Sequence, residues 1–148
     1  PMSLDDLGLI PTLQRYIETY QEESKIAVSF KTRGTCDQLK PVVSLTVFRL
    51  VQEAINNIKK HAHASKVTIN LEFLEKELKL YIVDNGVGFD IDSLKTRGHN
   101  NNGGFGLISM RERVQLLDGN FEINSTIGKG TRLYITVPLI PEEGVSDG

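Results

Sequence analysis

The sequence predicts a two-layer α/β sandwich in which three helices pack on one face of a mixed, mostly antiparallel sheet. Apolar residues recur at helical spacing in three segments, and they alternate with polar residues in four others. An element with one apolar face must bury that face against another element, which favours two packed layers. With 148 residues, of which 39% are hydrophobic, the chain is long enough to form one domain with its own core.

Three segments have the apolar spacing of amphipathic helices. The first runs from Leu9 to Glu23, and the third runs from Leu107 to Leu117, where Asp118-Gly119 provides a stop signal. The second begins at Pro41, after a polar loop, because proline suits the first turn of a helix. Its apolar stripe is formed by Val47, Leu50, Val51, Ala54, Ile55, Ile58 and Ala62. We expect this long helix to pack on the sheet.

Four segments have the period-two alternation of half-buried strands. They are Val67 to Phe73, Leu78 to Asp84, Phe121 to Ser125, and Thr131 to Val137. The polar residues around Glu75-Lys76 predict a hairpin between the first two. Pro138 ends the last strand because proline cannot donate to a strand ladder. A shorter alternating run, Ala27 to Thr32, follows the first helix.

Composition argues against several classes of function. The single cysteine, Cys36, can form neither an internal disulfide nor a multi-cysteine zinc site, which favours a reducing, cytoplasmic location. The 17 basic and 19 acidic residues give a net charge of −2, which argues against a nucleic-acid partner. No segment approaches the ~20 apolar residues of a membrane span, and no signal peptide opens the chain. We expect no direct membrane contact by this chain, and leave open whether a parent protein is membrane-anchored.

Two glycine-containing turns point to nucleotide binding. Asp84-Asn85-Gly86-Val87-Gly88-Phe89 follows an apolar strand, and a polar loop separates it from Gly103-Gly104-Phe105-Gly106-Leu107. Glycines allow the backbone to approach a flat polar ligand closely, and a helix N-terminus after the second turn suits phosphate. A dinucleotide-binding turn is disfavoured because an asparagine-rich loop, instead of a strand, precedes the second turn. The chain also lacks a phosphate loop of the Walker type.

The polar face of the long helix gathers groups that suit a metal ion and phosphates. At about 100° per residue, five side chains share this face and His61 lies at its border. The five are Arg49, Glu53, Asn56, Asn57 and Lys60. A carboxylate, an amide oxygen and a cation together suit a hydrated Mg²⁺ ion and its phosphates, because Mg²⁺ prefers oxygen ligands and keeps several waters. The alternative interpretation is a solvated helix face without a ligand.

Four motifs, in their usual order, resemble those of GHKL (Bergerat-fold) ATP-binding domains. Gln52 to His61 resembles the family's asparagine box, Asp84 to Phe89 its first glycine box, and Gly104 to Leu107 its second. Gly128-Lys129-Gly130-Thr131, which leads into the last strand, resembles the closing glycine-threonine element. The resemblance implies the Bergerat, or histidine-kinase ATPase, fold with ATP and Mg²⁺ as ligands.

Other segments are similar to sensor histidine kinases of the nitrate-sensor and desaturase-regulator type. Pro1 to Ile10 resembles the linker that follows the dimerisation helices of those kinases. Lys60 to Ser65 and Gly106 to Val114 are also close to the sequences of that group. The resemblance implies a linker at 1–10 from an absent dimerisation and phosphotransfer domain, an ATP-binding catalytic domain at 11–140, and a flexible tail at 141–148.

The resemblance implies which residues hold the base, the sugar and the metal ion. Asp84 is expected to accept a hydrogen bond from the adenine amine, and Thr131 is expected to add a hydroxyl beside it. Asn57 is the expected Mg²⁺ ligand and part of the ATP site. Lys60 is expected to face the phosphates, and His61 is expected to line the sugar or the edge of the base.

The remaining implied roles belong to the two glycine turns and to one acid. Gly86 and Gly88 are expected to allow the sharp first turn. The second turn is expected to present backbone N–H groups to phosphates, and its ATP-binding residues are Gly104, Phe105, Gly106 and Leu107. The loop from Ile91 to Asn102 is the expected lid over ATP. Glu53 is the candidate catalytic residue, with the choice between a general base and an orienting group left open.

The implied reaction is transfer of the γ-phosphoryl group of ATP to a histidine on the dimerisation domain of a homodimeric phosphoprotein, with a response regulator as the later partner. The chain's histidines are His61, His63 and His99, and none lies in the expected acceptor motif. We therefore expect the chain to bind ATP without phosphorylating itself efficiently. Two alternatives stay open, an anti-sigma-factor serine kinase of the same fold and a nucleotide-gated interaction module without kinase activity.

Overall fold

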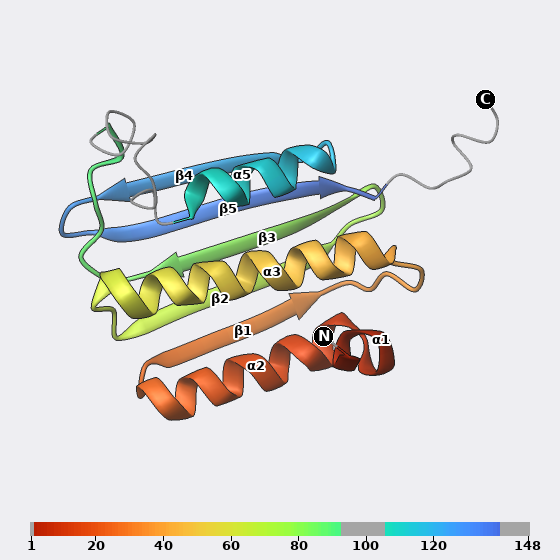
Figure 1. Cartoon of the computed structure of the whole chain (residues 1–148), viewed down its shortest axis with the longest axis horizontal. Coiled ribbons are helices and arrows are strands. Elements are labelled where there is room, and N and C mark those ends of the chain that lie inside the picture. The colour runs from red at the N-terminus through yellow and green to blue at the C-terminus, as the bar shows by residue number, and fades with distance from the viewer. Residues whose placement is uncertain (1, 93–105, 140–148) are drawn as a thin grey trace.

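The computed structural model describes residues 2–92 and 106–139, which form a five-stranded sheet covered by helices on one face (Figure 1). The strands are β1 (Ala27–Arg33), β2 (Lys66–Phe73), β3 (Glu77–Asp84), β4 (Asn120–Thr126) and β5 (Gly130–Pro138). Their order across the sheet is β1-β2-β3-β5-β4. The predicted two-layer α/β sandwich is confirmed, and all four predicted strands lie within one residue of their expected bounds.

The three predicted helices are present as α2 (Leu9–Ser24), α3 (Pro41–Asn57) and α5 (Leu107–Leu116). The described residues also contain α1 (Met2–Leu7), a short helix inside the range expected as a linker. After Asn57 the long helix continues as one π-helical turn, η1 (Ile58–Ala62). Side chains after Asn57 therefore depart from α-helical spacing. None of the helices in the described ranges is both long and apolar enough to cross a membrane.

The alternating run that begins at Ala27 forms the edge strand β1, which makes the sheet mixed. β1 pairs with β2 in parallel, whereas the other neighbouring strands are antiparallel. Parallel neighbours cannot be joined by a tight turn and need a crossover, which here contains α3. The crossover lays α3 over the sheet between α2 and α5, with its last turn at the end of the molecule where β3 ends (Figure 1).

The core lies between the sheet and the helical layer. On β2 every second side chain points inward, as the alternation predicts, and Val67, Ile69 and Leu71 are fully buried. The predicted apolar stripe of the long helix is the buried face of α3 and η1, where Val47, Leu50 and Val51 have no exposed surface. Burial of this stripe fixes the rotation of α3, so its polar residues are placed by the packing of its apolar ones.

The packing of α3 predicts a large difference between two leucine truncations. Leu50→Ala should lower the free energy of unfolding by about 2 to 5 kcal/mol, because Leu50 is fully buried and its loss leaves a cavity. The matched control is Leu116→Ala on α5, where the side chain is 83% exposed and the expected change is within about 0.5 kcal/mol. Urea unfolding of both variants measures the difference, and equal losses would contradict the described packing.

Candidate nucleotide-binding site

A pocket opens where β3 ends and β5 begins, beside the last turns of the long helix. Its walls are mostly apolar, with a few polar groups from α3, η1, β3 and β5. The residues that line it are Ala54, Asn57, Ile58, His61, Ala62, Ile82, Asp84, Gly88, Phe89, Leu107, Ile123, Thr131 and Leu133. An apolar pocket with a few convergent polar groups is the common form of a small-molecule site.

Asp84 is the buried acid of this pocket, with only 6% of its surface exposed. Its Oδ1 accepts a hydrogen bond of 2.8 Å from the Gly86 N–H, and the backbone of Thr131 also hydrogen-bonds its carboxylate. Burial raises the pKa of the Asp84 carboxyl above its usual value, and the two hydrogen bonds offset only part of that rise. A buried acceptor of this kind favours a ligand that donates a hydrogen bond.

Backbone contacts hold the first glycine turn against η1. The Val87 N–H donates to the Ala62 carbonyl over 2.7 Å. A Cβ atom at Gly86 would lie 2.6 Å from Ala62 Cβ and even closer to the Ala62 carbonyl oxygen. Only glycine fits this approach without moving the backbone. The π turn therefore presents the Ala62 carbonyl to the turn that follows Asp84, and π turns are frequent at functional sites.

Asn85 has no role in the sequence-based prediction, and the structure gives it one. Its Oδ1 accepts hydrogen bonds from the N–H groups of Ser65 (2.9 Å) and Lys66 (3.0 Å), and its Nδ2 donates to Ser65 Oγ over 3.0 Å. These bonds tie the end of β3 to the start of β2 directly behind Asp84. The sequence offers one indication of this role, because Asn85 lies between an acid and a glycine and asparagine is typical of turns.

The end of the second glycine turn lies against the long helix. Gly106 is the N-cap of α5 and has φ +70°, a left-handed conformation that favours glycine. A Cβ atom there would lie 2.8 Å from Cδ of Glu53. The Glu53 carboxylate thus lies beside the N-terminus of α5, and Leu107 in the first turn of α5 lines the pocket. A helix N-terminus also favours phosphate, because its N–H groups have no partners within the helix.

Some predicted site residues fall outside the described part of the chain. Gly104 and Phe105 of the second turn are among them, as are positions 93–102 of the expected lid. Of that lid, the structure describes only Ile91 and Asp92. Their roles stay predictions.

The structure separates residues that the sequence placed on one polar helix face. Asn57 and His61 line the pocket, whereas Lys60 is exposed and lies outside the described lining. The Arg49 guanidinium donates to Gln52 Oε1 over 2.9 Å, and Asn56 is exposed. Side-chain directions after Asn57 no longer follow 100° steps, because the helix continues there as a π turn. The role of Lys60 at the phosphates stays a prediction.

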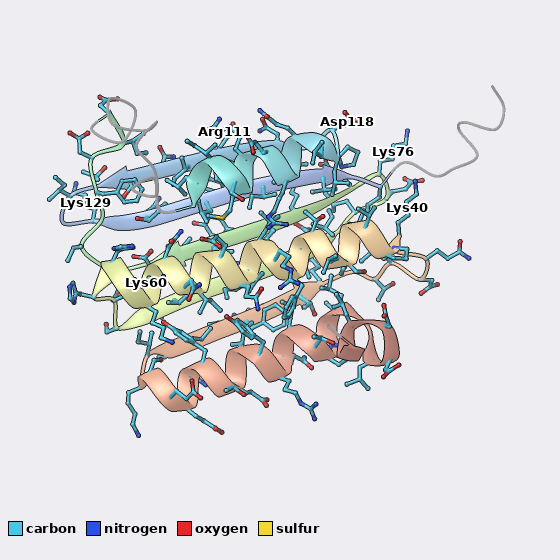
Figure 2. The ribbon with its side chains drawn as sticks, viewed as in Figure 1. Lys40, Lys60, Lys76, Arg111, Asp118 and Lys129 are labelled. Carbon is cyan, nitrogen blue, oxygen red and sulfur yellow. The ribbon has the colours of Figure 1, made fainter. Side chains whose placement is uncertain are left out.

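His61 lines the pocket although much of its side chain is exposed. Burial, and secondarily the charge of Lys60, lower the pKa of the His61 imidazole below its usual value. Figure 2 shows Lys60 and Lys129 at the same end of the molecule, the end at which η1 and the β4–β5 turn lie. Two cationic side chains therefore lie at the end of the molecule where the pocket opens, which suits a ligand that carries phosphates.

Thr131 lies directly opposite Asp84 on the neighbouring strand β5 and lines the pocket. Its Oγ1 is 2.8 Å from Ser125 Oγ, and Ser125 Oγ also accepts a hydrogen bond of 2.9 Å from the Phe89 N–H. Ser125 has no predicted role, because a serine at the end of an alternating strand carries no distinctive signal. The contacts place it next to the expected adenine-binding hydroxyl.

The donor groups at the inner end of the pocket fit a hydrated Mg²⁺ ion. Asn57 lines the pocket with a side chain that carries an amide oxygen. Glu53, one helical turn earlier, carries its carboxylate to the N-terminus of α5. Neutral and anionic oxygens are the ligands that Mg²⁺ prefers, with water and phosphate completing the shell.

Comparison with protein families matches residues 42–141 to the family described as "Histidine kinase-, DNA gyrase B-, and HSP90-like ATPase". The matched region includes all of α3 except its first residue, the sheet strands β2 to β5 and all the predicted site residues. It covers well over half of the chain, which establishes membership.

Two relatives are named as histidine kinases. The chain is 45% identical over 142 residues to the signal transduction histidine-protein kinase/phosphatase DegS of Bacillus subtilis, covering 94% of this chain and 36% of DegS. It is 34% identical over 140 residues to the oxygen sensor histidine kinase NreB of Staphylococcus carnosus, covering 94% of this chain and 39% of NreB. The chain thus spans less than two fifths of these relatives, and the predicted resemblance to sensor histidine kinases is confirmed.

A solved structure confirms the fold. The histidine kinase AdeS of Acinetobacter baumannii aligns with a TM-score of 0.67 at 18% identity, covering 90% of this chain and 64% of the AdeS chain. The predicted histidine-kinase ATPase fold is therefore confirmed. The chain belongs to the family of histidine kinase-, DNA gyrase B- and HSP90-like ATPases, and ATP is the nucleotide that this membership implies.

Proposed function

We propose that this chain is the ATP-binding catalytic domain of a two-component sensor histidine kinase, which transfers the γ-phosphoryl group of ATP to a histidine on a separate dimerisation domain. The observation that carries the proposal is the buried Asp84 carboxylate in an apolar pocket close to the N-terminus of α5. The names of the relatives support the kinase activity.

Adenine is proposed to bind with its exocyclic amine toward Asp84. Apolar side chains of the pocket, among them Ile58, Ile123 and Leu133, offer surfaces for the faces of the base. The Asp84 carboxylate accepts the amine's hydrogen bond, and the Thr131 hydroxyl lies beside it. A base without a donor at this position leaves a buried acceptor unpaired, which is a strong basis for selectivity.

The phosphates are proposed to lie toward α5 and the cationic end of the molecule where the pocket opens. Gly106 and the first turn of α5 offer N–H groups to them, and Leu107 closes the adjoining wall. Gly104 and Phe105, which lie outside the described residues, are proposed from the resemblance to bind ATP as well, and Lys60 is proposed to neutralise phosphate charge. Asn57 would hold Mg²⁺, which supplies charge neutralisation on the phosphates when bound.

Phosphoryl transfer requires positioning and charge neutralisation more than covalent chemistry by the enzyme. A bond forms between the acceptor imidazole nitrogen and the γ-phosphorus as the bond from that phosphorus to the bridging oxygen breaks, and ADP leaves. Glu53 is the proposed catalytic residue, because its carboxylate lies beside the N-terminus of α5, where the phosphates would end. There it can accept a proton from, or orient, the incoming imidazole.

The proposed organisation of the parent protein follows the motifs. Residues 1–10 are assigned to the linker from the dimerisation domain, 11–140 to the catalytic domain, and 141–148 to a flexible tail outside the described residues. The proposed partners are that dimerisation domain, within a homodimer, and a response regulator. Catalysis is proposed to take place in the cytoplasm.

Asp84→Asn should lower the affinity for ATP about 10- to 100-fold, because the amide presents a donor or a weaker acceptor to the adenine amine. Calorimetric titration with ATP and Mg²⁺ measures the loss. Asp37→Asn, at an exposed position in the loop before α3, is the matched control and should bind like the wild type. Equal affinity of Asp84→Asn and the wild type would refute the adenine assignment.

Without nucleotide, Asp84→Asn should stabilise the folded state at neutral pH. The folded-state pKa of Asp84 is raised by burial, so its ionised form destabilises the folded state at neutral pH. This cost disappears as pH falls through the raised pKa toward the unfolded value of about 3.9. The free energy of unfolding of the wild type, measured relative to Asp84→Asn, should therefore increase as pH falls from about 7 to about 4. A difference that is flat or decreases over this range would contradict the buried charge.

Phosphoryl transfer should require a separately supplied acceptor domain. With γ-labelled ATP the isolated chain should label itself only slowly, and it should label the dimerisation domain of its parent protein when the two are mixed. Glu53→Gln should reduce that transfer at least tenfold while keeping ATP affinity within about threefold. Glu18→Gln, exposed on α2, is the matched control.

The binding and labelling experiments also distinguish the proposed histidine kinase from the interaction module and the serine kinase. Tight ATP binding without transfer to the acceptor domain would favour a nucleotide-gated interaction module. Rapid self-labelling of the isolated chain would contradict the proposed need for a separate acceptor. Labelling of a serine in a partner protein, with none on histidine, would favour the anti-sigma-factor serine kinase.

A further inference from the structure

We infer that Ser125 is a positioning residue that holds the Thr131 hydroxyl as a hydrogen-bond acceptor toward the pocket, and thereby sets a preference for 6-aminopurine over 6-oxopurine nucleotides. The inference rests on the proposed ATP site and adds a residue to it. Ser125 lies on β4, outside the motifs that identified the pocket. It is linked to three of their members by its single hydroxyl group.

The three contacts of Ser125 Oγ use the whole capacity of a hydroxyl. It accepts from the Phe89 N–H over 2.9 Å, donates to the Gly130 carbonyl over 3.2 Å, and lies 2.8 Å from Thr131 Oγ1. A serine hydroxyl has one hydrogen and two lone pairs. Three partners at hydrogen-bond distance therefore leave it no capacity for a fourth.

The Phe89 N–H and the Gly130 carbonyl determine which hydroxyl donates in the contact between Ser125 and Thr131. A backbone N–H can only donate and a backbone carbonyl can only accept. The Phe89 N–H therefore occupies one lone pair of Ser125, and the Gly130 carbonyl takes its hydrogen. The remaining lone pair faces Thr131, so the hydrogen in that 2.8 Å contact belongs to Thr131. Thr131 then has lone pairs, and no hydrogen, to offer to the pocket.

This arrangement places two acceptors side by side in the pocket. Asp84 and Thr131 are direct partners across the β3–β5 ladder, and both line the pocket. A 6-amino group, directly or through one water, can donate to this pair. A 6-oxo group has no hydrogen to donate. Its oxygen would face the Asp84 carboxylate and the Thr131 hydroxyl oxygen, both also acceptors, and this lowers the affinity. Without the Ser125 hydroxyl, Thr131 is free to turn its hydrogen toward a 6-oxo group.

The matched measurement is calorimetric binding of ATP and of inosine triphosphate, each with Mg²⁺, to the same set of variants. The wild type should prefer ATP. Ser125→Ala should reduce the ratio of ATP affinity to inosine triphosphate affinity about three- to tenfold. Ser125→Thr keeps the hydroxyl and should restore the ratio to within about twofold. Thr19→Ala, exposed on α2, is the control and should leave the ratio unchanged.

A purely structural role for Ser125 makes a different prediction. Loss of its bonds to Phe89 and Gly130 would loosen the pocket for every purine nucleotide and lower both affinities by the same factor. A constant ratio in Ser125→Ala would therefore overturn the inference while leaving the proposed function intact. Failure of the wild type to bind ATP at all would instead refute the proposed function.

A second variant, Thr131→Val, keeps the inference testable if Ser125→Ala folds poorly. Thr131→Val removes the hydroxyl that Ser125 is proposed to orient, so it should also reduce the ratio of the two affinities. In the Thr131→Val background, Ser125→Ala should then have no further effect on the ratio. An unchanged ratio in Thr131→Val would overturn the inference as clearly as an unchanged ratio in Ser125→Ala.

Discussion

The burial of one ionisable carboxylate, that of Asp84, is the constraint on which the rest of the site depends. A carboxylate with 6% exposure at the end of an apolar strand carries a desolvation cost. The hydrogen bond from Gly86 offsets part of this cost, and it exists only because the chain turns sharply there. That turn is held in place by the carbonyl of Ala62 in η1. The geometry of helix, turn and strand is thus tied to the position of a single charge.

The fold supplies this charge with neighbours from distant parts of the sequence. The parallel pairing of β1 and β2 requires a crossover, and the crossover helix α3 carries Glu53 and Asn57 over the sheet to the end of β3. The central pairing of β3 with β5 places Thr131 opposite Asp84. The candidate ATP-binding site therefore forms at the end of the sheet at which the long helix ends, with the N-terminus of α5 beside it.

Much of this arrangement could be predicted from the sequence, because apolar periodicity determines which faces are buried. The helices and four strands follow from it, and the glycine turns locate the pocket. The π turn at Ile58 could not be predicted, since Ile58 and Ala62 continue the apolar stripe of an ordinary α-helix. The roles of Asn85 and Ser125 could not be predicted either, because they depend on hydrogen bonds to residues 20 and 36 positions away in the sequence. Sequence spacing does not reveal such contacts.

A crystal structure of the chain with a non-hydrolysable ATP analogue and Mg²⁺ tests the central claim most directly. The account predicts that the adenine ring lies between the apolar walls of the pocket, with its exocyclic amine within hydrogen-bond distance of the Asp84 carboxylate. It also predicts that the phosphates extend toward the N-terminus of α5. A base bound elsewhere, or an adenine amine that makes no contact with Asp84, would contradict the account.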